Sequence, residues 1–137
     1  MRMAMPNKVI TIQSDLDIVA ARMAARDMAK AMGFGAIDQA RIATAISELA
    51  RNIYLYAGEG TVTVSEIQQG LRKGLQVVCE DQGPGIEDIS LVMQDGYTTS
   101  KGMGMGMPGA KRLMDEFEIE SVVGEGTKIT CRKWKRP

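Results

Sequence analysis

The stretch Gly102-Met103-Gly104-Met105-Gly106-Met107-Pro108-Gly109 is the starting point for assigning the fold of this chain. Glycine at every second position adds no side chains to a core, and inside a helix or strand it would lower stability. It does provide a backbone that bends freely and presents uncovered N–H groups to an anion. A flexible loop without a ligand would have the same composition, so the interpretation depends on the other segments that accompany it.

Three further segments occur with this glycine run in a fixed order. Glu48-Leu49-Ala50-Arg51-Asn52 places a carboxylate and an amide four residues apart in a helical pattern. Asp81-Gln82-Gly83-Pro84-Gly85 places an acid and two glycines at the end of an apolar strand, and Gly124-Glu125-Gly126-Thr127 follows near the C-terminus. Each segment alone is a weak signal, whereas the four in this order jointly indicate one functional site.

Length and charge narrow the class of protein. The 137 residues predict one domain spanning residues 1–137, with a single core. Seventeen basic and seventeen acidic residues give a net charge of zero, so nothing electrostatic argues for nucleic acid or membrane as partner. The basic segment 132–136 is interpreted as a short solvated tail. Since neither a signal peptide nor an apolar run approaching about 20 residues is found, we expect a cytoplasmic protein.

The cysteine and histidine content limits the chemistry. Cys79 and Cys131 lie in apolar, strand-like segments and are expected to be reduced core residues. Two cysteines without any histidine argue against a zinc site. The absence of histidine also excludes a Ser-His-Asp triad, a Cys-His pair and an autophosphorylated histidine. Any proton transfer therefore falls to a carboxylate, a lysine or a tyrosine.

Hydrophobic periodicity predicts an alternation of strands and helices. The expected segments are a strand at 9–12, a helix from Ser14 as N-cap to Gly33 as C-cap, a helix from Ile37 or Asp38 to Tyr56, strands at 61–67 and 75–80 around a turn at 70–74, a short helix at 86–94, a helix at 111–117, and a hairpin of 118–123 and 128–134. This order indicates an α/β two-layer sandwich, with helices on one face of a mixed, mostly antiparallel sheet.

Glu48 and Asn52 are expected to face the same way at the rim of a buried helical stripe. That stripe consists of Ile42, Ile46, Leu49 and Ile53. An amide oxygen can bind Mg²⁺ when a nucleotide supplies the remaining oxygens, and a neighbouring carboxylate can orient a nucleophile. A solvated glutamate and a surface asparagine would show the same spacing.

Asp81 is suited to bind the base of a nucleotide, and the glycine run is suited to bind its phosphates. A purine amine needs a rigid, ionised acceptor, and Asp81 stands at a strand end before glycines that let a flat ring approach; an aspartate there is also a common turn former. A helix beginning near residues 107–109, with Pro108 in its first turn, would point its positive end at phosphates.

These segments resemble the GHKL ATPase superfamily, which includes gyrase and the histidine kinases, and the resemblance covers most of the chain, from about residue 38 to residue 130. Within the superfamily, the segments 47–58, 80–86 and 96–100 look like those of the switch kinases of bacterial stressosomes. The resemblance implies the Bergerat sandwich and the cofactors ATP and Mg²⁺.

The resemblance also implies roles for individual residues. Asn52 corresponds to the Mg²⁺ ligand, and Glu48 to the carboxylate that activates the attacking hydroxyl or water. Asp81 corresponds to the acceptor of the adenine amine. The remaining nucleotide-binding positions are Gly83, Gly85 and Ile86 around the base, Gly102, Gly104 and Gly106 in the lid around the phosphates, and Thr127 near adenine. Lys101 departs from the small residue expected at its position, and it either touches the γ-phosphate or lies in solvent.

Three functions are compatible with such a site. In the first, the chain is a serine/threonine kinase that phosphorylates STAS-domain proteins similar to RsbS and RsbR and activates a serine phosphatase similar to RsbU. In the second, it is an anti-sigma factor kinase of the SpoIIAB and RsbW type. In the third, it is a nucleotide-dependent binding module without significant catalysis, although such a module has no need of Glu48 as a base.

Overall fold

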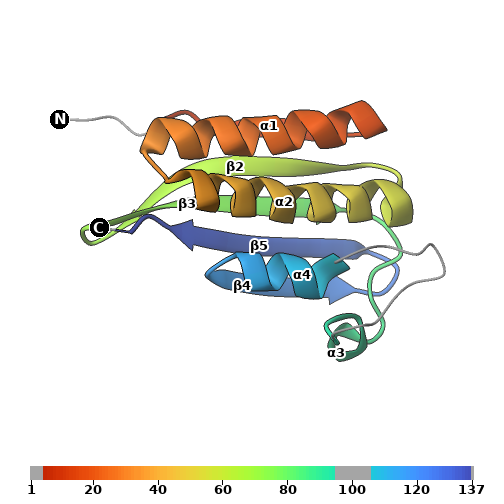
Figure 1. The fold of residues 1–137 in the computed structure, drawn as a ribbon. Helices are drawn as coiled ribbons and strands as arrows, with labels where there is room; N and C mark the ends of the chain where they lie inside the picture. The colour runs from red at the N-terminus through yellow and green to blue at the C-terminus, as the bar shows by residue number, and fades with distance from the viewer. Residues whose placement is uncertain (1–4, 95–105, 137) are drawn as a thin grey trace.

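The computed structural model describes residues 5–94 and 106–136, and Figure 1 shows helices covering one face of a sheet. The elements in chain order are β1 (Lys8–Ile12), α1 (Asp15–Met32), α2 (Ala36–Asn52), the π-helical turn η1 (Ile53–Ala57), β2 (Gly60–Gln69), β3 (Arg72–Asp81), α3 (Ile89–Val92), α4 (Gly106–Leu113), β4 (Glu116–Val122) and β5 (Gly126–Trp134). The predicted α/β two-layer sandwich is confirmed.

The five strands are arranged in the order β1-β2-β3-β5-β4, and each neighbouring pair is antiparallel. β3 is central, and its last residue, Asp81, lies between Gly60 of β2 and Thr127 of β5. The sheet therefore fixes Asp81 from both sides.

The core lies between the helices and the inner face of the sheet. Helix α2 contributes Ile42, Ile46 and Leu49, and Ile53 follows in η1; all four are at most 3% exposed, which confirms the predicted stripe. Every second side chain of the central strands points toward these helix residues, because successive side chains of a strand lie on opposite faces of the sheet. The residues from the central strands are Val62, Val64, Leu75, Val77, Cys79, Ile129 and Cys131. None of the helices among the described residues is long and apolar enough to span a bilayer.

Both expected caps of α1 are at the predicted residues, but the N-cap works differently. Gly33 ends the helix at φ 91°, and its N–H donates to carbonyls of the last turn. Ser14 is the N-cap, yet its hydroxyl donates to Asp17 instead of accepting an N–H bond. Asp17 in turn accepts a hydrogen bond from the backbone N–H of Gln13. The Asp17 carboxylate therefore ties the two residues before the helix to its first turn.

The second helix differs from the prediction at its end. It is helical to residue 57, but the α-helix stops at Asn52 and the next five residues form the π-helical turn η1. Apolar spacing is nearly the same in both forms, so the sequence pattern does not distinguish them.

Two further segments were predicted incorrectly. Strand β2 ends at Gln69 and strand β3 begins at Arg72. The turn between them therefore contains only residues 70 and 71, instead of the predicted 70–74. Helix α4 ends at Leu113, and Phe117 lies in β4. The backbone N–H of Asp115 donates to the Arg132 carbonyl, which starts strand pairing before a longer helix could form.

The basic C-terminal segment is not a solvated tail. Lys133 and Trp134 are 4% and 8% exposed and belong to β5. The Lys133 ammonium donates to the Leu113 carbonyl and lies 3.5 Å from Asp115, so the buried charge is paired.

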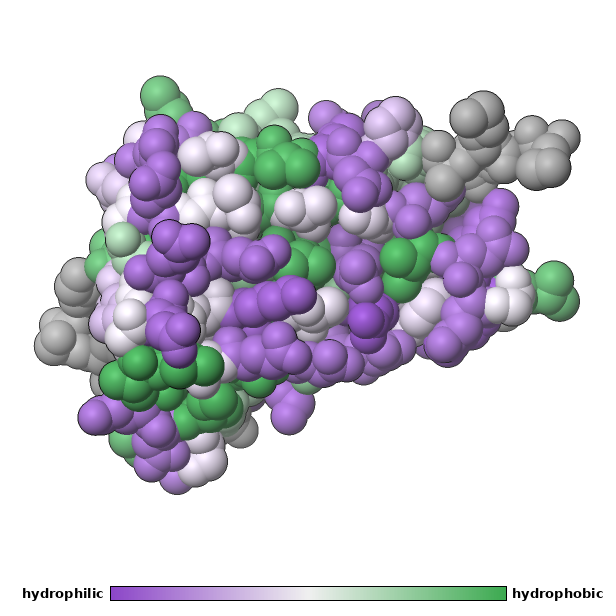
Figure 2. Space-filling model, turned by 180° about the vertical axis from the view of Figure 1, so that it is seen from behind, coloured by the Kyte–Doolittle hydropathy of each residue, from purple (hydrophilic) through white to green (hydrophobic). Residues whose placement is uncertain are grey.

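None of the helices in the described residues lies on the other face of the sheet. Figure 2 shows that face as mainly hydrophilic, with one cluster of hydrophobic side chains at the lower left and others dispersed over it. At its edge, β4 directs Glu116, Glu118 and Glu120 outward, and Arg132 of β5 forms ion pairs with the first two at 3.0 and 3.5 Å. Strands β1 and β4 are the two edges of the sheet.

Candidate functional site

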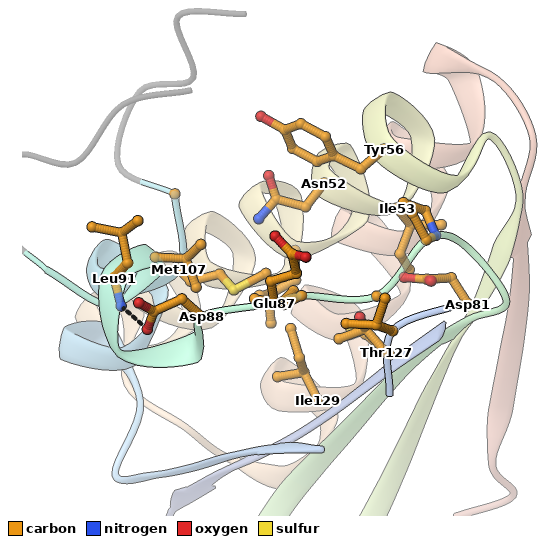
Figure 3. A pocket seen from close by; sticks show the side chains of 18 of the residues that line it. Asn52, Ile53, Tyr56, Asp81, Glu87, Asp88, Leu91, Met107, Thr127 and Ile129 are labelled. Carbon is orange, nitrogen blue, oxygen red and sulfur yellow. Dashed lines mark hydrogen bonds between the residues drawn. The ribbon is translucent and has the colours of Figure 1, made fainter. Parts of the chain in front are cut away.

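A cavity of about 580 Å³ opens at the end of the molecule where β3 finishes. Its walls come from the end of α2, η1, the loop after β3, α3, the first residues of α4, and the start of β5 (Figure 3). This volume is in the range of small-molecule sites. Residues far apart in the sequence therefore meet around a single space of ligand size.

Asp81 and Thr127 lie together on one side of this cavity (Figure 3), as paired residues of β3 and β5. The Gly83 N–H donates to Asp81 Oδ1 at 2.9 Å, which fixes the carboxylate in a turn. Among the described residues, Oδ2 of Asp81 has no hydrogen-bond partner. The prediction of a rigid acceptor at this strand end therefore agrees with the geometry, and one oxygen is left for a ligand.

Ser121 organises the backbone around this acceptor. Its hydroxyl accepts the Ile86 N–H at 2.8 Å and lies 2.9 Å from Thr127 Oγ1 and 3.0 Å from the Gly126 carbonyl oxygen. The loop after β3 is thus tied to the β4–β5 hairpin. Nothing in the sequence around Ser121 indicated this role, because its partners are brought to it by sheet pairing.

The glycines near Asp81 are required for backbone packing. A Cβ on Gly83 would lie 2.7 Å from the Ala57 Cβ, and Gly83 does not line the cavity. Gly85 lines it at φ 78°, and its Cβ would meet the Val122 carbonyl oxygen at 2.5 Å. Gly126 has φ 136°, and its Cβ would be 2.1 Å from the Asp81 carbonyl oxygen. Gly83 and Gly85 were expected to leave room for a base; Gly83 lies outside the cavity lining and packs against Ala57, whereas Gly85 lines the cavity and packs against the backbone of the β4–β5 hairpin.

The cavity floor is apolar and includes Cys79 and Ile129. Cys79 and Cys131 are buried and free, in the core positions expected for them. Burial raises the pKa of the Cys79 thiol well above its usual value, and burial raises the pKa of Cys131 to about 12. Both thiols therefore remain protonated near neutral pH.

Asn52 forms part of the opposite wall. It is 9% exposed, lines the cavity, and has no side-chain hydrogen bond to any described residue. Figure 3 shows its amide directed inward. Directly after Asn52 the helix widens into η1, and Tyr56 of this turn also lines the cavity. Such π-helical turns are frequent at functional sites.

Glu48 lies one turn before Asn52 and is not part of the cavity lining. Its Oε1 accepts from Arg51 at 3.1 Å, and its side chain is 13% exposed. Its Oε2 is buried without a hydrogen-bond partner in the part of the chain that the structure describes. A buried carboxylate oxygen without a partner costs free energy, and such an atom is suited to a ligand or substrate proton.

Helix α4 begins at the cavity, where Gly106, Met107 and Pro108 line it. The expectation that its N-terminus faces the site therefore agrees with the structure. Gly106 has φ 59°, a backbone conformation that favours glycine. The other proposed lid residues, Gly102 and Gly104, lie outside the described residues, as does Lys101.

Several lining residues were not predicted from the sequence. These are Tyr56, Pro84, Glu87, Asp88, Leu91, Val92, Met107 and Val123, together with the floor residues named above. Glu87 and Asp88 follow the Gly83-Pro84-Gly85 turn after one residue, Ile86, so their position in the chain was a signal for them. No sequence signal pointed to Val123, because the β4–β5 hairpin brings this residue to the cavity.

Comparisons with known proteins decide the family. A family model described as the histidine kinase-like ATPase domain matches residues 12–133. The chain belongs to the histidine kinase-like ATPase family. The resemblance to the GHKL superfamily is thereby confirmed, and membership of this ATPase family implies use of ATP.

Curated relatives within the histidine kinase-like ATPase family are close in sequence. Serine/threonine-protein kinase RsbT of Bacillus subtilis is 58% identical over 127 residues, which are 93% of this chain and 96% of that protein. Anti-sigma F factor of Thermoanaerobacter sp. is 36% identical over 101 residues, covering 69% of both chains.

Solved structures share the fold of this family. The RsbU and RsbW domains of a Mycobacterium tuberculosis protein match with a TM-score of 0.62 at 21% identity, over 97% of this chain and 34% of that one. The mycobacterial sensor histidine kinase MprB matches with a TM-score of 0.58 at 18% identity, over 96% and 99%. At these identities the likeness concerns the fold alone.

Proposed function

We propose that this chain is an ATP-dependent serine/threonine protein kinase of a bacterial partner-switching pathway. It acts in the cytoplasm as one ATP-binding domain over residues 1–137, phosphorylates STAS-domain proteins similar to RsbS and RsbR, and activates a serine phosphatase similar to RsbU when released. The observation that carries the proposal is one cavity with a fixed acceptor, Asp81, on one side and Asn52 on the other. One turn before Asn52, a Glu48 oxygen has no partner among the described residues. The identity to RsbT supports the choice of a kinase.

Asp81 supplies recognition of the base. Oδ2 accepts the exocyclic amine of adenine while Oδ1 remains bonded to the Gly83 N–H. Guanine carries a carbonyl at the equivalent position, and two acceptors facing each other leave both unpaired. ATP is therefore preferred over GTP.

Asn52 fits a site for Mg²⁺ that depends on the nucleotide. Its amide is directed into the cavity and has no hydrogen-bond partner among the described residues. Within the same residues, no group of three acidic, cysteine or histidine side chains could hold a metal by itself. Mg²⁺ keeps few protein ligands and takes phosphate oxygens and water for the rest. When bound there, it neutralises charge on the transferred phosphoryl group.

Glu48 accepts the proton of the attacking hydroxyl. Its Oε2 is buried and has no partner in the part of the chain that the structure describes, and the Arg51 contact holds the other oxygen in place. General-base assistance of this kind contributes about 10²–10⁴-fold in rate. The phosphoryl group moves to a partner's serine or threonine, since the chain has no histidine to carry it.

The experiment is incubation with Mg·ATP and a STAS-domain partner, followed by mass spectrometry of the partner. We expect acid-stable phosphoserine or phosphothreonine, with little ATP hydrolysis in the absence of partner. Glu48→Gln should bind ATP normally and lose transfer by about 10²–10⁴-fold. Glu120→Gln, which removes an exposed charge on the outer face of β4, is the matched control and should keep full transfer. An unmodified partner in an intact complex would instead favour a binding module.

An anti-sigma factor kinase is the second candidate. The 36% identity to anti-sigma F factor over two thirds of the chain supports it. Recovery of a sigma factor, without STAS or phosphatase proteins, in a pull-down with the full chain would select this alternative.

A further inference from the structure

Glu87 has an acidic side chain that faces the cavity and is not used by the proposed kinase reaction. It lines the cavity with an exposed side chain, and Figure 3 shows its carboxylate directed inward, between Asn52 and Thr127. No described residue donates a hydrogen bond to Glu87 or forms an ion pair with it. A carboxylate placed in a cavity for a polyanionic nucleotide repels the phosphates unless it meets a donor or a cation.

Asp88, the next residue, differs from Glu87 because one of its carboxylate oxygens is used by the fold. Asp88 Oδ1 accepts the Leu91 N–H and the Ser90 hydroxyl, both at 3.0 Å, and so caps α3. Its carboxylate is engaged in the fold. Both acids line the same cavity and are exposed, but Asp88 is held through its Oδ1, whereas neither carboxylate oxygen of Glu87 has a described partner.

The backbone on both sides of Glu87 is held in place. Ile86 donates its N–H to Ser121 at 2.8 Å, and Asp88 is fixed by the α3 cap. Gly85, with φ 78°, packs against the β4–β5 hairpin. The residue is therefore presented from a fixed backbone, which lowers the entropic cost of using its side chain.

The order of groups along the cavity selects the part of the ligand that Glu87 meets. Asp81 and Thr127 mark the base side, whereas Asn52 and the start of α4 at Gly106 mark the phosphate side. The ribose of an adenine nucleotide connects these two sides, and its 2′- and 3′-hydroxyls are the donors of that part. Acidic side chains bind ribose hydroxyls in other nucleotide sites.

We propose that Glu87 is a specificity-determining residue that accepts hydrogen bonds from the ribose hydroxyls, so that the site distinguishes ribonucleotides from deoxyribonucleotides. The inference rests on the proposed ATP site and adds a sugar preference to it. A hydrogen bond to a charged acceptor at this position corresponds to a preference of about tenfold.

Calorimetric titration of the full chain with ADP, 2′-deoxy-ADP and 3′-deoxy-ADP, each with Mg²⁺ and with EDTA, tests the inference. The unmodified chain should prefer ADP about tenfold over at least one deoxy analogue in both conditions. Glu87→Ala should bind all three nucleotides with equal affinity. Glu87→Gln should show an intermediate preference for ADP, because its side-chain carbonyl can still accept a hydrogen bond from a ribose hydroxyl. Glu125→Gln removes an exposed charge outside the main cavity and should keep the preference.

Three results would overturn the inference. The ADP preference could be equal in the unmodified chain and Glu87→Ala. All three affinities could rise together in Glu87→Gln, which would make Glu87 only a repulsive charge. The preference could depend on Mg²⁺, which would make Glu87 a metal ligand. A chain that binds none of the nucleotides would instead overturn the proposed function, and this inference with it.

Discussion

The two sides of the cavity are built in different ways. The base side consists of strand ends and turns locked by backbone contacts: Asp81 between two strands, and Gly126 with no room for a Cβ. The phosphate side consists of side chains from helix ends, in which Asn52 has no described partner and a π-helical turn follows it. The base side is preorganised by the fold, whereas the other side depends on the ligand for its partners.

Gly126→Ala tests the rigidity of the base side and should have the largest effect. The added Cβ meets the Asp81 carbonyl oxygen at 2.1 Å in a backbone conformation that disfavours alanine, so we expect a loss of about 3 kcal/mol in unfolding free energy. Urea denaturation measures this loss. Gly124→Ala is the control, because its φ of 83° is also positive but nothing lies within 4 Å. Equal losses in the two variants would show that steric contact with β3 does not matter.

Asp81→Asn keeps the turn but changes the acceptor. The amide oxygen can still accept the Gly83 N–H, while an NH₂ group replaces the free oxygen and faces the adenine amine. We expect ATP binding to weaken by about 30-fold and the preference over GTP to narrow. Competition titrations with both nucleotides measure this. Glu80→Gln, an exposed neighbour, should bind as the unmodified chain does; GTP competing equally in the unmodified chain would contradict the assignment.

Asn52→Ala addresses the phosphate side. Loss of the amide oxygen should weaken Mg·ATP binding by about tenfold, while binding in EDTA and the melting temperature change little because the side chain has no described partner. Calorimetry with and without Mg²⁺ separates the loss of metal-dependent affinity from any loss of affinity for the nucleotide itself. If Asn52→Ala bound Mg·ATP with the affinity of the unmodified chain, Asn52 would not be a metal ligand.

Ser121→Ala should have the smallest effect of the four. It removes the acceptor of the Ile86 N–H, which corresponds to about 1 kcal/mol of stability. Ser90→Ala is the control, because Ser90 is exposed and its hydroxyl donates only to Asp88 among the described residues. A Ser121→Ala chain as stable as the control would mean that the hairpin holds the loop without this hydroxyl.

Features encoded by contiguous residues were predictable from the sequence. The buried stripe of α2, the Gly33 cap and the succession of strands and helices along the chain follow from local periodicity and turn chemistry. Asp81 was identifiable because it follows an apolar strand and precedes two glycines within a few residues.

Features that depend on distant partners were not predictable. Ser121 is 35 residues from Ile86, and the buried Lys133 depends on Leu113 and Asp115 from other elements. The π-helical turn changes the hydrogen bonding without changing the apolar spacing. The orientation of Glu87 depends on anchors on either side of it, which a linear pattern does not reveal.

The glutamates of β4 have a consequence for the behaviour of the chain at high concentration. An edge strand offers unpaired backbone groups to which another copy could add a strand. A second β4 laid antiparallel and centred on Glu118 would place Glu116 against Glu120 and Glu118 against its own copy. Like charges directly opposite each other oppose such pairing. The arrangement therefore protects this edge against aggregation through β4–β4 association.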